Sequence, residues 1–165
     1  MTFKEYIKVN NIEKGAKMID CSNSSLTDLN DIEEFACLVY LDCHGNGLTQ
    51  LPNLDKLVNL IFLFCDSNRL TKLPNLDKLI NLKKLRCAHN TLTKLPNLNN
   101  LVNLYYLNCD NNRLCELPNL DKLVNLEHLY CYNNKLPESF NGLSIEGKKN
   151  LVSQINRNEK IDELI

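Results

Sequence analysis

A single 22-residue period runs through most of this 165-residue chain. Six cysteines mark the period, each 22 residues after the one before: Cys21, Cys43, Cys65, Cys87, Cys109 and Cys131. Between them, near-identical copies of LPNLDKLVNL recur, and the last leucine of each copy opens an 11-residue block of the form L-x-x-L-x-C-x-x-N-x-L. One such unit is too small to bury its own apolar side, so it must stack on its neighbours. The period therefore predicts a solenoid.

The order of residues within the block predicts a short β-strand. Leucine at the first and fourth positions, cysteine at the sixth and leucine at the eleventh place apolar side chains inward around a strand with a two-residue period. Stacked units then form a parallel sheet with about 4.8 Å between strands. In the return segment Leu51, Leu54 and Leu57 recur every three residues, which favours a short 3₁₀ or helical turn on the outer side.

This block resembles the leucine-rich repeat, with cysteine where leucine usually stands at the sixth position. The resemblance covers residues 16–136 as five complete units and one truncated unit, the last. The cysteine-bearing, asparagine-rich repeat is similar to repeats from giant DNA viruses of amoebae and from some bacterial proteins. The resemblance implies an α/β solenoid: a right-handed arc with a parallel β-sheet on its concave side and short 3₁₀ or helical segments on its convex side.

We expect one domain over 1–165, closed by a helical cap at each end, because an open solenoid end exposes core. The N-terminal cap is residues 1–15. Within it Thr2 and Glu5 match a capping box, and the apolar residues that follow predict a helix over 3–12.

The segment 137–165 breaks the repeat and forms the predicted C-terminal cap. Ser144 is placed to cap a helix that runs to about Ile155. Residues 156–165 form either a second short helix or a frayed tail.

The six spaced cysteines permit four interpretations. Side chains in register on a parallel sheet have Cβ atoms about 4.8 Å apart, beyond the usual 3.5–4.5 Å of a disulfide. A linear row does not surround a metal ion, and thiols in an apolar interior are inert. We therefore expect core packing. Cys37 and Cys115 lie off the row, where either could be accessible.

Asparagine occupies the ninth position of five units, where a short amide can bond the backbone of neighbouring turns. The three histidines, His44, His89 and His128, lie two units apart, so roughly 10 Å separates successive rings by strand spacing. Three rings at that separation cannot share a metal ion. We expect no cofactor, no metal and no catalytic site.

The variable positions carry the functional signal. The second, third, fifth, seventh and eighth positions of six units give 30 places on or beside the concave side, and these hold 7 of the 11 Phe and Tyr residues. Exposed aromatic residues gathered on one rigid face mark a partner-binding surface. The alternative is that some of these rings pack between neighbouring rows. The predicted partner-binding residues are Tyr40, Asp42, Phe62, Phe64, Lys84, Arg86, Tyr106, His128, Tyr130 and Tyr132.

Charge narrows the class of partner. The 30 positions hold four basic and five acidic residues, and the whole chain has a net charge of −1. A nucleic-acid groove is strongly basic and a membrane span needs about 18 apolar residues, so neither partner is expected. The sequence predicts a non-enzymatic, monomeric module that binds a protein or peptide. The alternative is a homodimer formed through the same face.

The cysteines also bear on location. Eight thiols in a chain whose N-terminus carries charges and no secretory apolar stretch favour a reducing compartment. The expected location is the cytoplasm, either of the producing cell or of a host cell.

Overall fold

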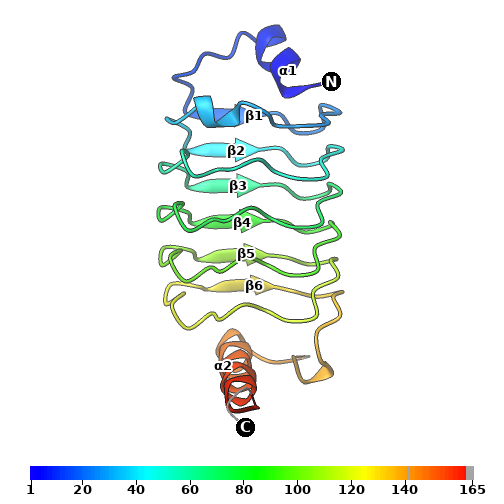
Figure 1. The fold of residues 1–165 in the computed structure, drawn as a ribbon, viewed down its shortest axis with the longest axis vertical. Coiled ribbons are helices and arrows are strands. Elements are labelled where there is room, and N and C mark those ends of the chain that lie inside the picture. Colours follow the sequence, from blue (N-terminus) through cyan, green and yellow to red (C-terminus); the bar gives the residue numbers. More distant parts are fainter. Residues whose placement is uncertain (141, 163–165) are drawn as a thin grey trace.

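The computed structural model describes residues 1–140 and 142–162, and it shows a solenoid whose turns stack along one axis (Figure 1). One short strand per turn contributes to a six-stranded sheet in which every neighbouring pair is parallel and the strand order follows the chain. The strands are β1 Met18–Asp20, β2 Tyr40–Asp42, β3 Phe62–Phe64, β4 Lys84–Arg86, β5 Tyr106–Asn108 and β6 His128–Tyr130. The predicted solenoid with a parallel sheet is confirmed.

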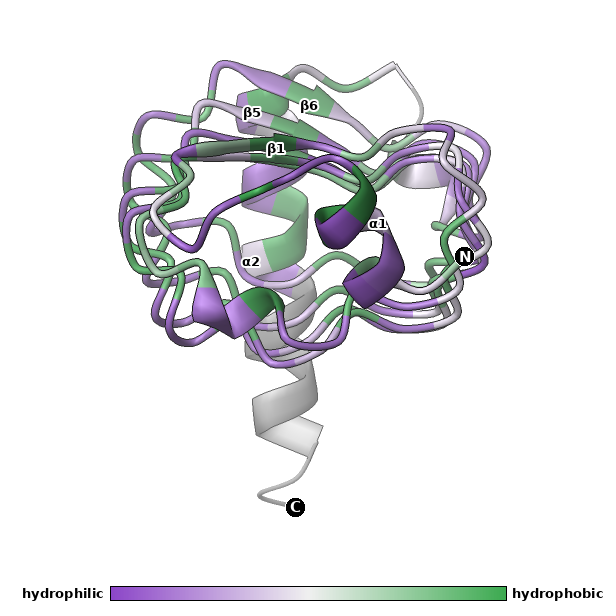
Figure 2. Cartoon of the chain, turned by 90° about the horizontal axis from the view of Figure 1, so that it is seen from above, coloured by the Kyte–Doolittle hydropathy of each residue, from purple (hydrophilic) through white to green (hydrophobic). Residues whose placement is uncertain are grey.

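Leucines from the sheet and from the return segments meet in one continuous core. The central residue of each strand points inward and is at most 6% exposed, from Ile19 in β1 to Leu129 in β6. Seen down the stack in Figure 2, the sheet lies along one side of the turns and the return segments lie opposite. Each buried leucine contributes about 1.5–3 kcal/mol, so the stacking of turns supplies the stability that one unit lacks.

The return segments bend by single hydrogen-bonded turns. In the second unit Leu57 N–H donates to Leu54 O and Leu60 N–H donates to Leu57 O, both at 2.9 Å. Only the first of the described return segments forms a regular 3₁₀ helix, η1 Ile32–Glu34. The three-residue leucine spacing thus predicted the turns correctly, although in later units they do not join into a helix.

The N-terminal cap has the predicted capping box. Helix α1 spans Phe3–Val9; Thr2 Oγ1 accepts from Glu5 N–H at 3.3 Å, and Glu5 Oε2 accepts from Thr2 N–H at 2.8 Å. The helix ends before residue 12 because Asn11 adopts a left-handed conformation, with φ of 52°. Phe3 is fully buried, so α1 closes the first turn of the stack.

The C-terminal cap is a short 3₁₀ helix, η2 Glu138–Phe140, followed by helix α2 Ile145–Asp162. Ser144 Oγ accepts from Gly147 N–H at 3.1 Å, as expected of a cap. The helix continues past residue 155 without a break, which corrects the expectation of a separate element there. No glycine or proline follows Gly147 to interrupt it. Residues 163–165 of the predicted tail lie outside the described residues.

Candidate functional site: the exposed face of the sheet

The interior of each turn is held by an asparagine ladder that leaves the outer face free to vary. Asn90 illustrates the pattern: its Nδ2 donates to Cys65 O at 3.0 Å and Cys87 O at 3.2 Å, and its Oδ1 accepts from Leu70 N–H at 2.9 Å. The side chain is 8% exposed. The same bonds recur in neighbouring units, so the predicted role of these amides in bonding the backbone is confirmed. They brace the scaffold beneath the face.

The cysteine row lies beside this ladder and consists of free, buried thiols. Each of the first five donates a hydrogen bond from Sγ to a carbonyl of the next turn, as Cys65 does to Arg86 O at 3.2 Å. Burial raises the pKa of Cys65 well above the ordinary thiol value, and the pKa values of its neighbours Cys43 and Cys87 rise for the same reason. These thiols therefore pack as core residues. Cys37 and Cys115 are exposed.

The solvent side of the sheet, which we call the concave face, presents two rows of side chains. Because the strands pair in register, residues one period apart line up across the sheet. From β2 to β6 the first row is Tyr40, Phe62, Lys84, Tyr106 and His128, and the second is Asp42, Phe64, Arg86, Asn108 and Tyr130. Nine of the ten predicted binding residues lie in these two rows; Tyr132 follows just after β6.

The N-terminal aromatic cluster consists of Tyr40, Phe62 and Phe64. The ring of Tyr40 lies 6.1 Å from that of Phe62 and 5.4 Å from that of Phe64. All three rings are half-buried, because they cover one another as well as the sheet. The Tyr40 hydroxyl donates to Asp42 Oδ2 at 3.2 Å, and burial together with that carboxylate raises the pKa of Tyr40 to about 12.

The C-terminal aromatic cluster consists of Tyr106, His128 and Tyr130. The Tyr106 ring lies 5.8 Å from that of His128 and 5.4 Å from that of Tyr130. This cluster is more open: Tyr130 is 37% exposed, and the neighbouring Tyr132 is 59% exposed.

Two cations on β4 separate the clusters, and their situations differ. Arg86 Cζ lies 5.2 Å from the centroid of the Phe64 ring, and Arg86 Nε pairs with Asp66 Oδ2 at 2.9 Å. The charge of Arg86 is therefore neutralised by a carboxylate of the same chain. Lys84 Nζ lies over the rings of Tyr105 and Tyr106, at 5.3 and 5.4 Å. Among the described residues it has no carboxylate partner. Lys84 is therefore the cation that this face offers to a ligand.

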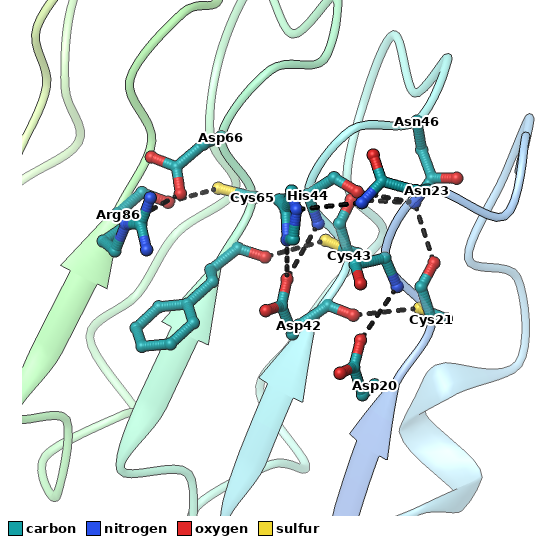
Figure 3. A network of polar contacts seen from close by, with 12 residues as sticks. Asp20, Cys21, Asn23, Asp42, Cys43, His44, Asn46, Cys65, Asp66 and Arg86 are labelled. Atoms are coloured by element: carbon teal, nitrogen blue, oxygen red, sulfur yellow. Dashed lines mark hydrogen bonds and ion pairs between the residues drawn. The ribbon is translucent and has the colours of Figure 1, made fainter.

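The carboxylates of Asp42 and Asp66 bind other groups of this chain. Asp42, 7% exposed, accepts at Oδ1 from the backbone N–H of His44 at 3.0 Å and lies 2.8 Å from that ring's Nδ1 (Figure 3). Asp66 accepts from Ala88 N–H at 3.0 Å, and burial raises its pKa despite the nearby arginine. Asp42 thus orients Tyr40 and His44.

Comparisons with known proteins agree with this architecture. A family model described as "Leucine Rich repeats (2 copies)" matches residues 80–122. No curated protein matches the chain. Among solved structures, the functional domain of InlJ from Listeria monocytogenes, whose title notes a cysteine ladder, is 36% identical with a TM-score of 0.71. YopM from Yersinia enterocolitica is 32% identical with a TM-score of 0.68.

The chain is a leucine-rich-repeat protein. The InlJ match covers 81% of this chain and the YopM match 78%, but each covers only 28% of the other protein. An effector LRR domain from Shigella, 30% identical with a TM-score of 0.64, aligns over 79% of this chain and 53% of its own. The chain therefore spans less than two thirds of each of these relatives. The bacterial part of the predicted resemblance is supported, and the viral part stays a prediction.

The eighth position of each leucine-rich repeat serves the backbone, which the sequence analysis did not foresee. Its residues all have left-handed φ angles between 51° and 66°: Asn23, Gly45, Ser67, His89, Asn111 and Asn133. Asparagine and glycine tolerate this conformation best. Their excess at this position was the available signal. The left-handed conformation is sufficient to account for the asparagine and glycine residues at this position.

The described residues, 1–140 and 142–162, contain no group of three or more His, Cys, Asp and Glu side chains placed to hold a metal ion. Within that same part of the chain, no helix has the length and apolar character needed to cross a bilayer.

Proposed function

We propose that this leucine-rich-repeat protein is a non-enzymatic module that binds a protein or peptide partner on its concave face. The observation that carries the proposal is the arrangement of the face, in which two aromatic clusters flank the unpaired cation Lys84. Aromatic side chains are enriched in protein interfaces, and a complementary charge beside them adds specificity.

The same arrangement indicates which chemical groups the partner presents. Apolar side chains of the partner pack on the clusters of β2–β3 and β5–β6, and one acidic group binds Lys84 on β4. Tyr130, His128 and Tyr132 supply the most accessible contacts. Tyr40, Phe62, Phe64 and Tyr106 form the half-buried base, with Asp42 and Arg86 positioning their neighbours.

The setting of this activity is part of the proposal. YopM from Yersinia pestis is titled a leucine-rich effector protein, and the Shigella neighbour is an effector domain. These similarities support a protein that acts in a host cell. Eight free thiols support a reducing compartment such as the cytoplasm.

Affinity capture from a eukaryotic cell lysate, analysed by mass spectrometry, tests the proposal. The baits are the wild type, a face variant Lys84→Glu/Tyr130→Ala, and a matched control Lys94→Glu/Val124→Ala. The control changes the same charge and also truncates one exposed apolar side chain, away from the face. Circular dichroism confirms that all three are folded.

We expect a protein that the wild type and the control enrich and the face variant does not. Equal capture by all three baits would contradict the proposal, because binding would then occur elsewhere. If no protein is captured and light scattering shows the monomer mass rising to the dimer mass as protein concentration increases, self-association replaces partner binding as the proposed function.

A further inference from the structure

A groove of about 650 Å³ runs beside the concave face, along the flank where the chain enters the strands. Its wall is made by Lys17, Val39, Ile61 and Lys83, which immediately precede β1, β2, β3 and β4. The exposed thiol of Cys37 also lines it. Its volume falls within the range of ligand sites. None of the predicted binding residues lines it, so this is a second surface.

The backbone of the groove is already satisfied. Val39 O accepts from Ile61 N–H at 2.8 Å, and Ile61 O accepts from Lys83 N–H at 2.9 Å. On the floor, the Asn59 side-chain amide donates to Ala36 O at 3.1 Å, and Asn81 donates in the same way to Val58 O at 3.0 Å. No open strand edge is available along this wall for a partner strand to pair with. A ligand must therefore be recognised by side chains.

Those side chains form a symmetrical pattern. Val39 and Ile61 are half-buried and make an apolar centre. Lys17 and Lys83 stand at the two ends, exposed, and neither ammonium has an ion pair or hydrogen bond within the described part of the chain. Two unpaired cations around an apolar centre attract a ligand with the opposite arrangement, two anions around an apolar group.

The strand spacing sets the size of that ligand. Lys17 and Lys83 lie three strand spacings apart, about 14 Å. In an extended peptide, side chains i and i+4 point the same way about 13 Å apart, and side chain i+2 lies midway. We propose that this groove binds an extended peptide segment with two carboxylates four residues apart and an aliphatic side chain halfway between them. The carboxylates bind Lys17 and Lys83, and the aliphatic group packs on Val39 and Ile61.

Cys37 makes the groove directly observable. It and Cys115 are the two exposed thiols of the eight, so maleimide under native conditions modifies these two, and Cys115 serves as an internal control outside the groove. The probe is the peptide Ac-GDSLSDG-NH2. The comparison peptide, Ac-GSDLDSG-NH2, has the same composition with its carboxylates two residues apart. Alkylation of each thiol is followed by peptide mass spectrometry.

We expect the probe to slow alkylation of Cys37 and to leave that of Cys115 unchanged. With the peptide at twice its dissociation constant, about one third of the molecules have a free groove, so alkylation slows about threefold. The comparison peptide should protect Cys37 markedly less. The variant Lys17→Met/Lys83→Met should lose the protection, whereas Lys56→Met/Lys78→Met, with the same change of charge on exposed return-segment residues, should keep it.

The ratio of rates with and without peptide is used within each variant, because removing lysines can itself alter the reactivity of Cys37. Absence of protection at peptide concentrations up to about 10 mM, where even weak ligands bind, would overturn the inference. Equal protection by both peptides, or by both double variants, would overturn it as well. The concave-face variant should retain protection, which separates this site from the proposed function.

Discussion

The two sides of the sheet show opposite sequence behaviour on the same backbone. On the inner side, nearly every unit has leucine, cysteine and asparagine at the same positions, and these residues bury themselves against the next turn. On the concave face the residue changes from unit to unit, so that one row reads Tyr, Phe, Lys, Tyr, His. Repetition follows stacking, because every turn must fit an identical neighbour. Variation marks the surface that stacking leaves free.

The two sides of the sheet are not completely different, because the aromatic residues of the concave face are partly buried. Phe62 and Phe64 are half-buried in their cluster, whereas Tyr132 at the end of the face is 59% exposed. Packing between rows and binding to a partner are therefore both available to the face.

The largest effect is expected in the asparagine ladder. Asn90→Ala should lower the free energy of unfolding by about 3 kcal/mol, because Leu70 N–H and two cysteine carbonyls lose partners in a buried site. Asn134→Ala in the last unit should cost less, because the Asn134 side chain is itself partly exposed and water can reach the groups that it leaves. Urea denaturation measures both. A cost for Asn90→Ala of less than about 1 kcal/mol, within the range of a single hydrogen bond, would show that the ladder is not structural.

The face should divide into a packed and a free part. Phe64→Ser should cost about 1–2 kcal/mol of unfolding free energy, because its ring contacts Tyr40 and Phe62 and supports Arg86. Tyr132→Ser should cost less, about 0.5–1 kcal/mol, because the 59% exposed ring of Tyr132 loses a cation–π contact with Lys148 Nζ, 5.2 Å from its centroid. Thermal and urea unfolding of the two variants measure these losses. Equal losses of unfolding free energy would contradict the division of the face into a packed and a free part.

A pH dependence should arise at Asp66. Burial raises the folded-state pKa of this carboxyl above its unfolded value, so its contribution to stability is fully present below about pH 4 and is lost as pH rises through the folded pKa. Asp66→Asn removes this loss. The variant should therefore gain stability relative to the wild type as pH rises from 3 to 7, measured by urea unfolding at each pH. A gain that shrinks with rising pH would mean that the Arg86 pair outweighs burial.

The smallest effect is expected at the eighth position, the border between the two sides. Ser67→Gly should stabilise the protein by about 0.5 kcal/mol, because glycine adopts a φ of 52° without strain. Gly45→Ala should destabilise it, since a Cβ there would clash with Asn23 Oδ1 at a φ of 66°. Differential scanning calorimetry distinguishes the two directions. Shifts of the same sign would contradict a conformational role for this position.

Most of the fold could be predicted because the same pattern occurs in six units. The spacing of Cys21 to Cys131 predicted the position of every strand, and the ninth-position asparagines were predicted to hydrogen-bond the backbone. Thr2 and Glu5 predicted the capping box of the first helix. The length of α2 was not predicted, because it lies outside the repeat and no neighbouring unit repeats its pattern.

The candidate site was only partly predictable. The period placed Lys84 and Arg86 side by side on β4, but it could not say that Asp66 would occupy the arginine and leave the lysine unpaired. The mutual covering of Tyr40 and Phe64 likewise depends on side-chain rotamers across rows. The groove beside Cys37 could not be predicted, because residues of several successive units line it and the repeat does not specify how their side chains lie relative to one another.

Hydroxyl-radical footprinting of the protein, alone and with the partner captured from a lysate, tests the central claim most directly. Five of the six tyrosines lie on or beside the concave face, and Tyr6 in the N-terminal cap serves as an internal reference. The account predicts that the partner reduces oxidation of Tyr130 and Tyr132 severalfold and leaves Tyr6 unchanged. Unchanged oxidation of both face tyrosines in the complex would contradict it.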